Sequence, residues 1–423
     1  MRMKLSRSSQ LGLVAAASLV AATLITACQQ FTQTLTVDFV YVACSKAAGA
    51  NQYGEIDVFE INSESGRMRQ IPTSPFPSGG RNPVAEAVSS DYQNLFVVNQ
   101  DDNNIVQFAV GIDGKLYPNN TVNTPGIFPL AIAASQNNVF VVDTYQPLPV
   151  CSPAEPCTGS ISVIPLVAPS TVQNCSTTVC LGTPANNSAV NGQYWPLTLP
   201  SAPNDIIVPT AVNVLASGAY VYVAAYDSSV TPNTGYVFGF AVGSGGVLTP
   251  LNGGVPHDMG IGSAGLGIHP SAIASDQTST YVYVTDSTND IVVGYSVASG
   301  ILTKIGDTPT GGQPSSVVVD LSYPFVYVTN SVDSTLTAYS MSSGALTSIG
   351  TYATGLQPVA IGIDPSTNHF LYTVNFLGNN VSGFELSPTQ GTLLVSQYSP
   401  YGTSAQPVAV AAVPHNGTGG GVQ

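Results

Sequence analysis

The sequence predicts an all-β protein that closes into a ring of seven four-stranded sheets, a seven-bladed β-propeller. Three observations support this prediction. One strand motif recurs along the chain, each copy is followed by the same order of strand and turn signals, and the two ends supply complementary parts of one sheet. No helical periodicity is visible after the first thirty residues.

The recurring motif is a β-branched and aromatic run that ends in turn-forming residues, which is typical of a strand. "FVYVTN" at 325–330 is one copy, and the seven copies begin at residues 39, 95, 139, 220, 281, 325 and 370. Each copy is followed by a second strand-like run and then by a hairpin signal, often Gly-x-Leu, as in "SGALTSIG" at 343–350. Glycine supplies the positive φ that tight hairpins require.

The last strand of each unit is a run of small residues that begins with proline. The seven runs begin at Pro83, Pro129, Pro209, Pro270, Pro314, Pro358 and Pro407. Their third and fifth positions are nearly all Ala, Ser or Gly. Because the blades of a propeller converge on its axis, we expect these runs to be innermost and to line the central channel.

The two ends of the repeat predict that the ring is closed. The motif at residue 39 has no proline-led run before it, and the run at 407–413 has no motif after it. Pairing 407–413 with 37–43 would complete a blade and remove two unpaired strand edges.

"VYVTN" at 326–330 resembles the YVTN-repeat propellers and the wider seven-bladed lactonase family, which includes 6-phosphogluconolactonase-like enzymes. The resemblance covers residues 36–414 and implies the propeller fold, which carries many functions. It also implies a lactone-opening hydrolase as one candidate activity. A phosphorylated substrate needs several cations, and Arg81 is the one cation expected at the channel mouth, so the resemblance points to a neutral lactone.

The first residues are predicted to be a secretory signal peptide over 1–27, with basic residues ahead of an uncharged apolar stretch. "ITAC" at 25–28 resembles the lipobox of bacterial lipoproteins, which implies cleavage before Cys28 and a lipid on its thiol. A retained membrane anchor is the alternative. Residues 28–35 would be a tether and 415–423 a flexible tail. We expect an exported cell-envelope protein, periplasmic or at the surface, held to the membrane only by this lipid.

The composition excludes several classes of partner. Charged residues make up 8% of the chain, and the formal net charge is −14. Binding to nucleic acid or to anionic membranes needs clustered Lys and Arg, so neither is expected. No phosphate-binding loop, dinucleotide fingerprint or zinc-protease motif is present, and no cofactor or metal is predicted. We expect a monomer.

An insertion at about 146–207 enlarges the third unit and contains four cysteines, Cys151, Cys157, Cys175 and Cys180. In an oxidising compartment they predict two local disulfides, although three pairings are available and metal binding is an alternative. The insertion could be a binding surface or a stapled cap. A smaller insertion is expected at 257–270. Cys44 stands where other copies have Asn or Asp, and we expect a half-buried free thiol.

Candidate site residues come from the position just before each innermost strand, which a propeller gathers around its channel mouth. These residues are Asn82, Phe128, Val208, His269, Gln313, Gln357 and Gln406, and five of them carry polar hydrogen-bonding side chains. The alternative is that they lie in extended turns before proline and meet only solvent.

Glu86 occupies the fourth position of its run, where the other six runs have Ile or Val. A carboxylate there is costly unless it is paired or neutral, and Arg81 is a candidate partner. In a hydrolase, Glu86 or His269 would be the base, and Arg81, Asn82 and the glutamines would be the donors. The same groups would also bind a sugar or peptide without reaction, and a purely structural Glu86–Arg81 pair is a further alternative.

Three functions follow from these patterns. The first is a scaffold that binds a small-molecule or protein ligand at the channel mouth, and the second is a hydrolase of a neutral lactone. The third is a propeller that only spaces other modules.

Overall fold

The structure is a computed structural model that describes residues 37–49, 51–147, 151, 157–172, 175–260, 262, 265–365 and 369–414. The predicted signal peptide, the lipidation site Cys28, the tether and the tail at 415–423 lie outside the described residues. Among the described residues, no helix has the length and apolar character needed to cross a membrane.

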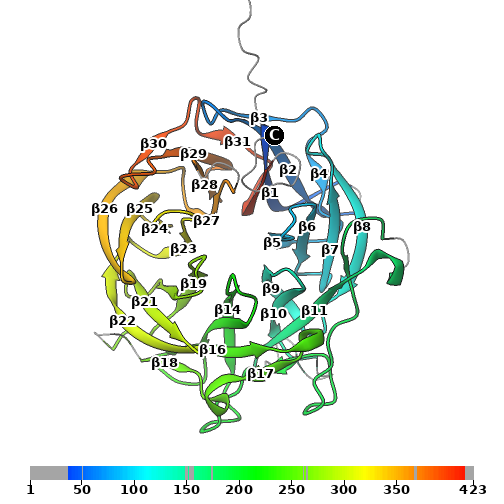
Figure 1. The fold of residues 1–423 in the computed structure, drawn as a ribbon, viewed down its shortest axis with the longest axis vertical. Coiled ribbons are helices and arrows are strands. Elements are labelled where there is room, and N and C mark those ends of the chain that lie inside the picture. The colour runs from blue at the N-terminus through cyan, green and yellow to red at the C-terminus, as the bar shows by residue number, and fades with distance from the viewer. Residues whose placement is uncertain are drawn as a thin grey trace, which may run out of the picture. The chain divides into compact units, whose positions relative to one another are not determined.

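Seven antiparallel sheets surround a common axis, which confirms the predicted propeller (Figure 1). The innermost strands are β5 (Pro83–Val88), β9 (Ile127–Ala134), β14 (Ile207–Val214), β19 (Pro270–Ser275), β23 (Pro314–Val319), β27 (Pro358–Ile363) and β32 (Pro407–Val413). The motif strands beside them are β6 (Asn94–Asn99), β10 (Asn138–Tyr145), β15 (Tyr220–Asp227), β20 (Tyr281–Asp286), β24 (Phe325–Asn330), β28 (Phe370–Asn375) and β1 (Val37–Ala48).

The outer half of each sheet follows the predicted order. The third strands are β7 (Asn104–Val110), β11 (Ser160–Val167), β16 (Thr234–Val242), β21 (Ile291–Ala298), β25 (Thr335–Ser342), β29 (Asn380–Leu386) and β2 (Tyr53–Asn62). The fourth strands are β8 (Leu116–Asn123), β12 (Cys180–Leu181), β17 (Leu248–Pro250), β22 (Ile301–Pro309), β26 (Ala345–Ala353), β30 (Leu393–Val395) and β3 (Met68–Gln70).

Short elements complete the sheets and loops. They are β4 (Phe76–Pro77), β13 (Trp195–Pro196), β18 (His257–Gly260), β31 (Tyr401–Gly402) and the 3₁₀ turns η1 (Pro169–Thr171), η2 (Ser244–Gly246) and η3 (Leu251–Gly254). We number the blades in chain order: blade 1 is β5–β8, blade 2 is β9–β13, blade 3 is β14–β18, blade 4 is β19–β22, blade 5 is β23–β26, blade 6 is β27–β31, and blade 7 is β32 with β1–β4.

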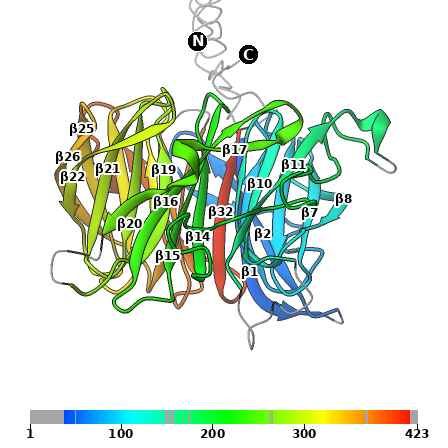
Figure 2. The same ribbon diagram turned by 90° about the horizontal axis from the view of Figure 1, so that it is seen from below.

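The proline-led strands are innermost, as predicted. Each contacts the innermost strands of both neighbouring blades, which brings all seven together around the axis. The ring is closed by blade 7, in which β32 pairs antiparallel with β1 (Figure 2). Phe39 lies opposite Val413 and Ala43 opposite Ala409, so the predicted pairing of the two chain ends is confirmed.

Successive blades are joined by a repeated hydrogen bond from a buried tyrosine. The third residue of the motif strand donates its hydroxyl to the carbonyl of the hairpin glycine in the next blade. The pairs and their distances are Tyr41 to Gly114 (3.0 Å), Tyr222 to Gly300 (2.8 Å), Tyr283 to Gly344 (3.0 Å) and Tyr327 to Gly391 (3.4 Å). We call this contact the tyrosine latch. It explains why the repeat pairs a tyrosine-bearing strand with a Gly-x-Leu hairpin.

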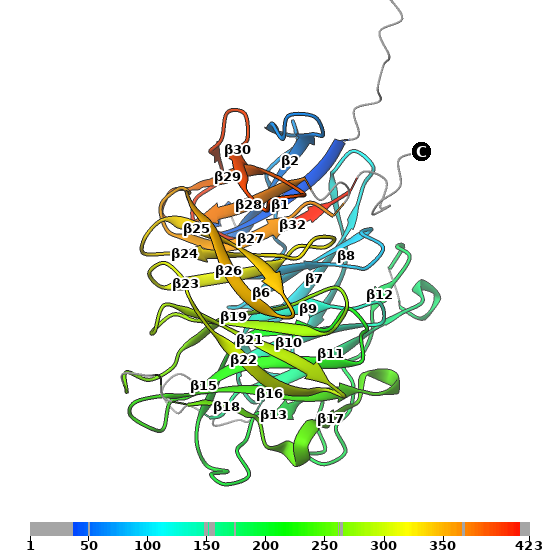
Figure 3. The same cartoon turned by 60° about the vertical axis from the view of Figure 1, so that its left-hand side comes forward.

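The latch is missing where the insertion lies. By strand register, the residue three positions before the partner of the proline is the latch tyrosine in blade 5, and it is Phe96 in blade 1 and Phe140 in blade 2, which have no hydroxyl. There, residues 175–181 of blade 2 form a strap along blade 1, and β12 lies beside β8 (Figure 3). The Gln107 side chain donates to the Val179 carbonyl (2.7 Å) and accepts from the Leu181 amide (3.0 Å).

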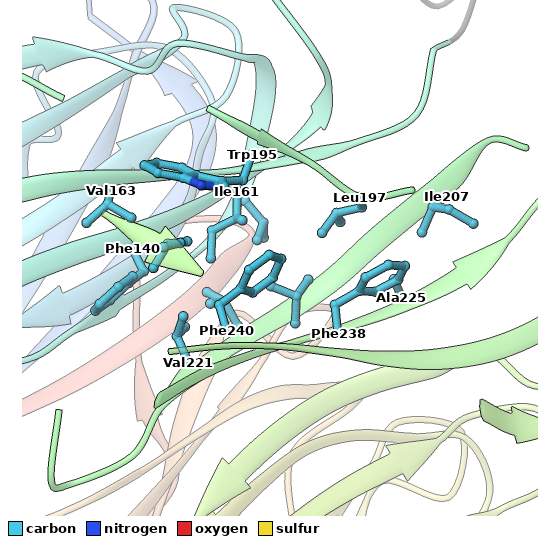
Figure 4. Packing of buried hydrophobic residues seen from close by; sticks show 14 of the residues in the cluster. Phe140, Ile161, Val163, Trp195, Leu197, Ile207, Val221, Ala225, Phe238 and Phe240 are labelled. Atoms are coloured by element: carbon cyan, nitrogen blue, oxygen red, sulfur yellow. The ribbon is translucent and has the colours of Figure 1, made fainter. Parts of the chain in front are cut away.

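The insertion also supplies core between blades 2 and 3. Trp195 is 4% exposed and packs with Phe140, Leu197 and Phe238 in one buried cluster (Figure 4). Both predicted disulfides are present, Cys151–Cys157 and Cys175–Cys180. The described parts of the insertion therefore cover blade edges, which favours the stapled cap over a free binding loop.

The latch predicts a contrast between two Tyr→Phe substitutions. Tyr222→Phe removes a hydroxyl donor from a buried carbonyl and should lower the free energy of unfolding by about 1 kcal/mol. Tyr372 is the equivalent residue of blade 6, and its buried hydroxyl has no hydrogen-bond partner among the described residues. Tyr372→Phe is the matched control and should be neutral or stabilising in urea unfolding. Equal losses in both variants would contradict the latch.

The strap predicts that its disulfide is structural. Replacing Cys175 and Cys180 with serine frees a crosslink between residues five positions apart, which should lower the free energy of unfolding by about 2 kcal/mol. Thermal unfolding of the double variant measures this loss. An unchanged unfolding temperature would show that the disulfide does not stabilise the strap.

Candidate functional site

The residues that precede the prolines of the innermost strands form the pre-proline mouth, defined by Asn82, Phe128, Val208, His269, Gln313, Gln357 and Gln406; Phe128 and Val208 already lie within β9 and β14. Five of them have positive φ rather than the extended backbone that a following proline favours, with values from 51° to 61°. These five residues are Asn82, Phe128, Gln313, Gln357 and Gln406. In each of these five blades, the pairing between the innermost strand and the motif strand shifts by one residue directly after the proline.

The unusual backbone is fixed by the preceding blade. The amide of Phe128 donates to Asn103 Oδ1 (2.7 Å), and that of Gln313 donates to Asp290 Oδ1 (2.7 Å). Gln406 donates in the same way to Asn379 (2.8 Å). Left-handed backbone at non-glycine residues persists only where its surroundings enforce it. The turns between second and third strands therefore set the direction of the mouth residues.

Blades 5, 6 and 7 contribute an amide half to the mouth. Gln313 and Gln406 are exposed and Gln357 is half-buried, and their side-chain amides make no hydrogen bond to a described residue. Asn82 of blade 1 differs because its amide donates to Gln100 Oε1 (3.3 Å) and to Asp101 Oδ1 (3.1 Å). Three neighbouring blades thus present amides that are available to a ligand.

Blades 2, 3 and 4 contribute an aromatic half. Phe128 meets Tyr145 edge to face with ring centroids 6.2 Å apart, and Tyr226 lies 4.4 Å from the His269 ring. Burial and the nearby Tyr145 raise the pKa of Tyr226. Sequence reasoning missed Tyr145 and Tyr226, although each is an aromatic residue near the end of a motif strand, beyond the run that defines the repeat.

His269 is held at the boundary of the aromatic half. Its backbone amide donates to Asp286 Oδ1 (3.1 Å), and its Nδ1 lies 3.5 Å from the Ser287 hydroxyl, which also donates to the His269 carbonyl (3.1 Å). Burial lowers the pKa of His269, so its imidazole is neutral at neutral pH. A neutral imidazole can accept a proton from water.

Arg81 does not pair with Glu86. Its guanidinium forms an ion pair with Asp102 (2.6 Å), and its backbone amide donates to the same carboxylate (2.7 Å). Asp102 follows β6, whose end lies beside the start of β5, whereas Glu86 lies within β5. The Arg81 charge is therefore neutralised by a neighbour in the turn.

Glu86 lies in the wall between blades 1 and 7. Both carboxyl oxygens are buried without a hydrogen bond to a described residue. Burial raises the pKa of Glu86 well above its usual range, an effect partly offset by the nearby backbone amides of Ala411 and Ala43. A protonated, neutral carboxyl explains how glutamate occupies a position that is Ile or Val elsewhere. The structure does not bring Glu86 together with His269 or Arg81.

Cys44 is buried rather than half-buried, with 1% of its surface exposed. Its Sγ lies 3.5 Å from Asp57 Oδ2, and Asp57 accepts the Ser404 amide (2.5 Å). In blade 5, Asn330 of the motif strand meets Thr337 of the third strand (2.9 Å). By strand register, Cys44 corresponds to Asn330 and Asp57 corresponds to Thr337. In blade 7 the polar side chain with the amide or carboxylate group is therefore on the third strand, as Asp57, instead of on the motif strand. Burial raises the pKa of the Cys44 thiol, which makes it unreactive.

The environment of Glu86 predicts a pH-dependent stability. The pKa of Glu86 is raised on folding. Its contribution to the free energy of unfolding is therefore complete below the usual carboxyl pKa of about 4 and is lost as pH rises. Glu86→Gln removes this loss and should gain stability relative to the wild type, by at most about 1.4 kcal/mol per pH unit. Urea unfolding at about pH 5 and about pH 8 measures the difference.

Asp143 is the internal reference for this experiment. Burial raises the pKa of Asp143 to about 7. This carboxyl therefore makes the free energy of unfolding fall with rising pH in both the wild type and Glu86→Gln. A wild-type curve parallel to that of Glu86→Gln would mean that Glu86 keeps an ordinary pKa in the folded state.

Comparison with known proteins agrees with this architecture. The sequence model of the family "Lactonase, 7-bladed beta-propeller" matches residues 260–363 and 312–411. No curated protein matches the chain in sequence. Many solved structures share the fold at low identity, and three of them illustrate the likeness.

The first is the periplasmic gluconolactonase PpgL of Pseudomonas aeruginosa, with a TM-score of 0.66 and 17% identity over 89% of this chain and 99% of that one. The second is a Bacteroides fragilis protein provisionally assigned as a 6-phosphogluconolactonase, with a TM-score of 0.63 and 16% identity over 90% and 99%. The third is AztD from Citrobacter koseri, with a TM-score of 0.53 and 14% identity over 92% of this chain and 100% of that one. The expected resemblance to the seven-bladed lactonase propellers is therefore confirmed, in sequence for the later blades and in fold for the whole ring.

Proposed function

We propose that this protein is a binding scaffold for a neutral, hydroxyl-rich small molecule, such as a sugar or a sugar lactone, at the pre-proline mouth. The observation that carries the proposal is the division of the mouth into an amide half and an aromatic half. Amides donate to and accept from hydroxyl groups, and aromatic faces cover the apolar faces of sugar rings. Ligand sites commonly combine apolar surface with a few polar groups in this way.

Charge at the mouth disfavours a phosphorylated ligand. Arg81 is already paired with Asp102. A second cation, the exposed Lys46, lies next to Ser45, whose amide donates to the Gln406 carbonyl (2.9 Å), so a phosphate would meet one unpaired cation rather than several. Phosphate recognition relies on cations or on convergent backbone amides. A neutral ligand, by contrast, needs only the free amides of Gln313, Gln357 and Gln406.

Hydrolysis of a neutral lactone is the second candidate, and His269 is the observation that favours it. The neutral imidazole would take a proton from water as the water oxygen attacks the lactone carbonyl. The ring C–O bond then breaks, and the proton passes to the departing alkoxide. The glutamine amides would stabilise the oxyanion. Among the seven pre-proline residues His269 is the one titratable side chain, which makes binding the stronger candidate.

We also propose that the protein is exported and lipid-anchored. Two disulfides support an oxidising compartment, and PpgL, which shares the fold, is named as periplasmic. The lipid on Cys28 would be the one membrane attachment, the strongly acidic chain would not bind nucleic acid, and the propeller would act as a monomer. A propeller that only spaces other modules would bind no ligand at the mouth.

The test uses the chain from residue 29 to 423 with a panel of neutral sugars and lactones. Calorimetry measures binding, and titration of released acid measures turnover. Loss of one amide contact in Gln357→Ala should weaken binding by about fivefold to tenfold. Gln397→Ala is the matched control because this exposed glutamine lies between β30 and β31, away from the innermost strands.

The outcomes separate the candidates. Binding without turnover supports the scaffold, and turnover that disappears in His269→Ala supports the hydrolase. Absence of both for every ligand, or equal binding by Gln357→Ala and the wild type, would overturn the site at the pre-proline mouth.

A further inference from the structure

The outer edge of blade 3 is open at Gly239, in the middle of its third strand, β16. The Gly243 amide donates to the Val247 carbonyl on the outer side (2.8 Å). Because backbone groups alternate sides along a strand, those of Gly239, four residues earlier, also face outward. The strand β17 ends opposite Phe240 and β18 begins opposite Val237, so neither of them covers Gly239 (Figure 1).

The equivalent backbone position has a partner in the other blades. In blades 6 and 7 its amide donates to a serine hydroxyl, and its carbonyl accepts a backbone amide. These bonds run from Val58 to Ser74 (2.8 Å), from Ile71 to Val58 (3.0 Å), from Gly383 to Ser399 (3.0 Å) and from Ser396 to Gly383 (2.9 Å). A continuous fourth strand pairs with this position in blades 1, 4 and 5, and in blade 2 the Val163 carbonyl accepts the Ala185 amide (2.8 Å). Neither backbone group of Gly239 has a partner among the described residues.

The loop beside Gly239 explains why this edge is open. It spans 251–256 and is one residue longer than the corresponding loops of blades 6 and 7, at 396–400 and 71–75. Val255 stands where both of those loops have serine. A hydrocarbon side chain cannot accept a hydrogen bond from the Gly239 amide, so the loop does not supply the partner that the other two loops supply.

Gly239 lies between two cavities and is accessible from them. It is half-buried, and because glycine has no side chain, the surface that it exposes is main chain. The cavities have volumes of 310 Å³ and 60 Å³, and Gly239, Val255 and Pro256 line both. Val255 is 50% exposed, and Ile301, on the wall that blade 4 gives to the larger cavity, is 45% exposed. The edge therefore combines a free backbone donor and acceptor with apolar pockets.

The charge at these cavities favours a basic partner. Asp258 is exposed and is the one charged residue among the described residues that line them, because burial lowers the pKa of His257 and keeps its imidazole neutral at neutral pH. Lys304 is close enough to act on His257, but its ammonium donates to Asp307 (2.9 Å). The net charge of the chain is −14, which also attracts a cationic partner.

We propose that the open edge of blade 3 binds an extended segment of a partner protein, in which an apolar side chain stands next to a lysine or arginine. A backbone carbonyl of the partner accepts the Gly239 amide, and a partner amide donates to the Gly239 carbonyl. These groups take the places that the serine hydroxyl and the loop amide take in blades 6 and 7. The apolar side chain enters the larger cavity against Ile301, and the cation meets Asp258.

Extended segments bind exposed strand edges in this way, with affinity from main-chain hydrogen bonds and specificity from side-chain pockets. This interaction surface goes beyond the function proposed for the pre-proline mouth and does not rest on it.

NMR on the chain from residue 29 to 423 tests the edge directly. Phe238–Gly239 is the one Phe–Gly pair in the sequence, so labelling the phenylalanine carbonyl and the glycine nitrogen identifies the Gly239 amide. In the free protein this amide should exchange with water at least about tenfold faster than the Gly383 amide, which is bonded to Ser399.

The probes are end-capped hexapeptides with Leu, Ile or Phe at one central position and Lys at the other, and a matched set with Glu in place of Lys. We expect a lysine peptide to shift the Gly239 signal and to slow its exchange by about tenfold at saturation. The glutamate set should bind more weakly, and Asp258→Asn should remove this difference.

Two further variants test the geometry. Val255→Ser combined with deletion of Gly253 gives the loop the length and the serine of blades 6 and 7, so it should close the edge and abolish peptide binding. Ile301→Asp keeps the test decisive if that loop variant does not fold, because it changes an exposed side chain of the cavity wall. It should weaken binding by about fivefold or more.

Several results would overturn the proposal. One is a Gly239 amide that is as protected in the free protein as the Gly383 amide. Others are the absence of binding by every lysine peptide, equal binding of the two peptide sets, and binding that is unchanged in Ile301→Asp. Protection of Gly239 that rises with protein concentration would identify a second copy of this chain as the occupant and would also overturn it.

Discussion

The tyrosine latch is the contact that the repeat uses to join one blade to the next, and it is formed at four of the seven junctions of the ring. A hydroxyl from the motif strand reaches a hairpin carbonyl in the following blade, for example from Tyr222 to Gly300 at 2.8 Å. Since both groups are buried, each needs the other as a hydrogen-bond partner. The hairpin glycine has a φ of 81°, and a side chain at that position would collide with Tyr220. The Gly-x-Leu signal and the aromatic motif are thus two halves of one contact.

The insertion takes the place of the latch at two of the three junctions where the latch is absent, the third being that of Tyr372 in blade 6. Phe96 and Phe140 cannot donate, and these are the junctions at which the strap and the Trp195 cluster add contacts. A disulfide-stapled segment that would lack a core of its own gains one from the blades that it joins. Ring assembly therefore explains the four cysteines, and the proposed ligand site lies apart from them at the pre-proline mouth.

The pre-proline mouth divides its side chains between two halves. Amides come from blades 5 to 7, and an aromatic half comes from blades 2 to 4. Two charged candidates are removed from the mouth, Arg81 by its ion pair with Asp102 and Glu86 by burial between blades 1 and 7. The mouth is therefore suited to the neutral ligand that we propose.

The sequence by itself determined the blade count, the order of strands in each blade and the closure of the ring, whereas the structure chose the disulfide partners among three possible pairings. These features follow from local patterns that repeat seven times, and small innermost residues are a direct consequence of convergence on an axis. The tertiary structure decided which polar residues meet. Glu86 and Arg81 are five positions apart, yet strand alternation buries the first against blade 7 while a turn gives the second to Asp102. Partners such as Tyr226 for His269 come from neighbouring blades, and no local pattern records a contact between residues so far apart in the chain.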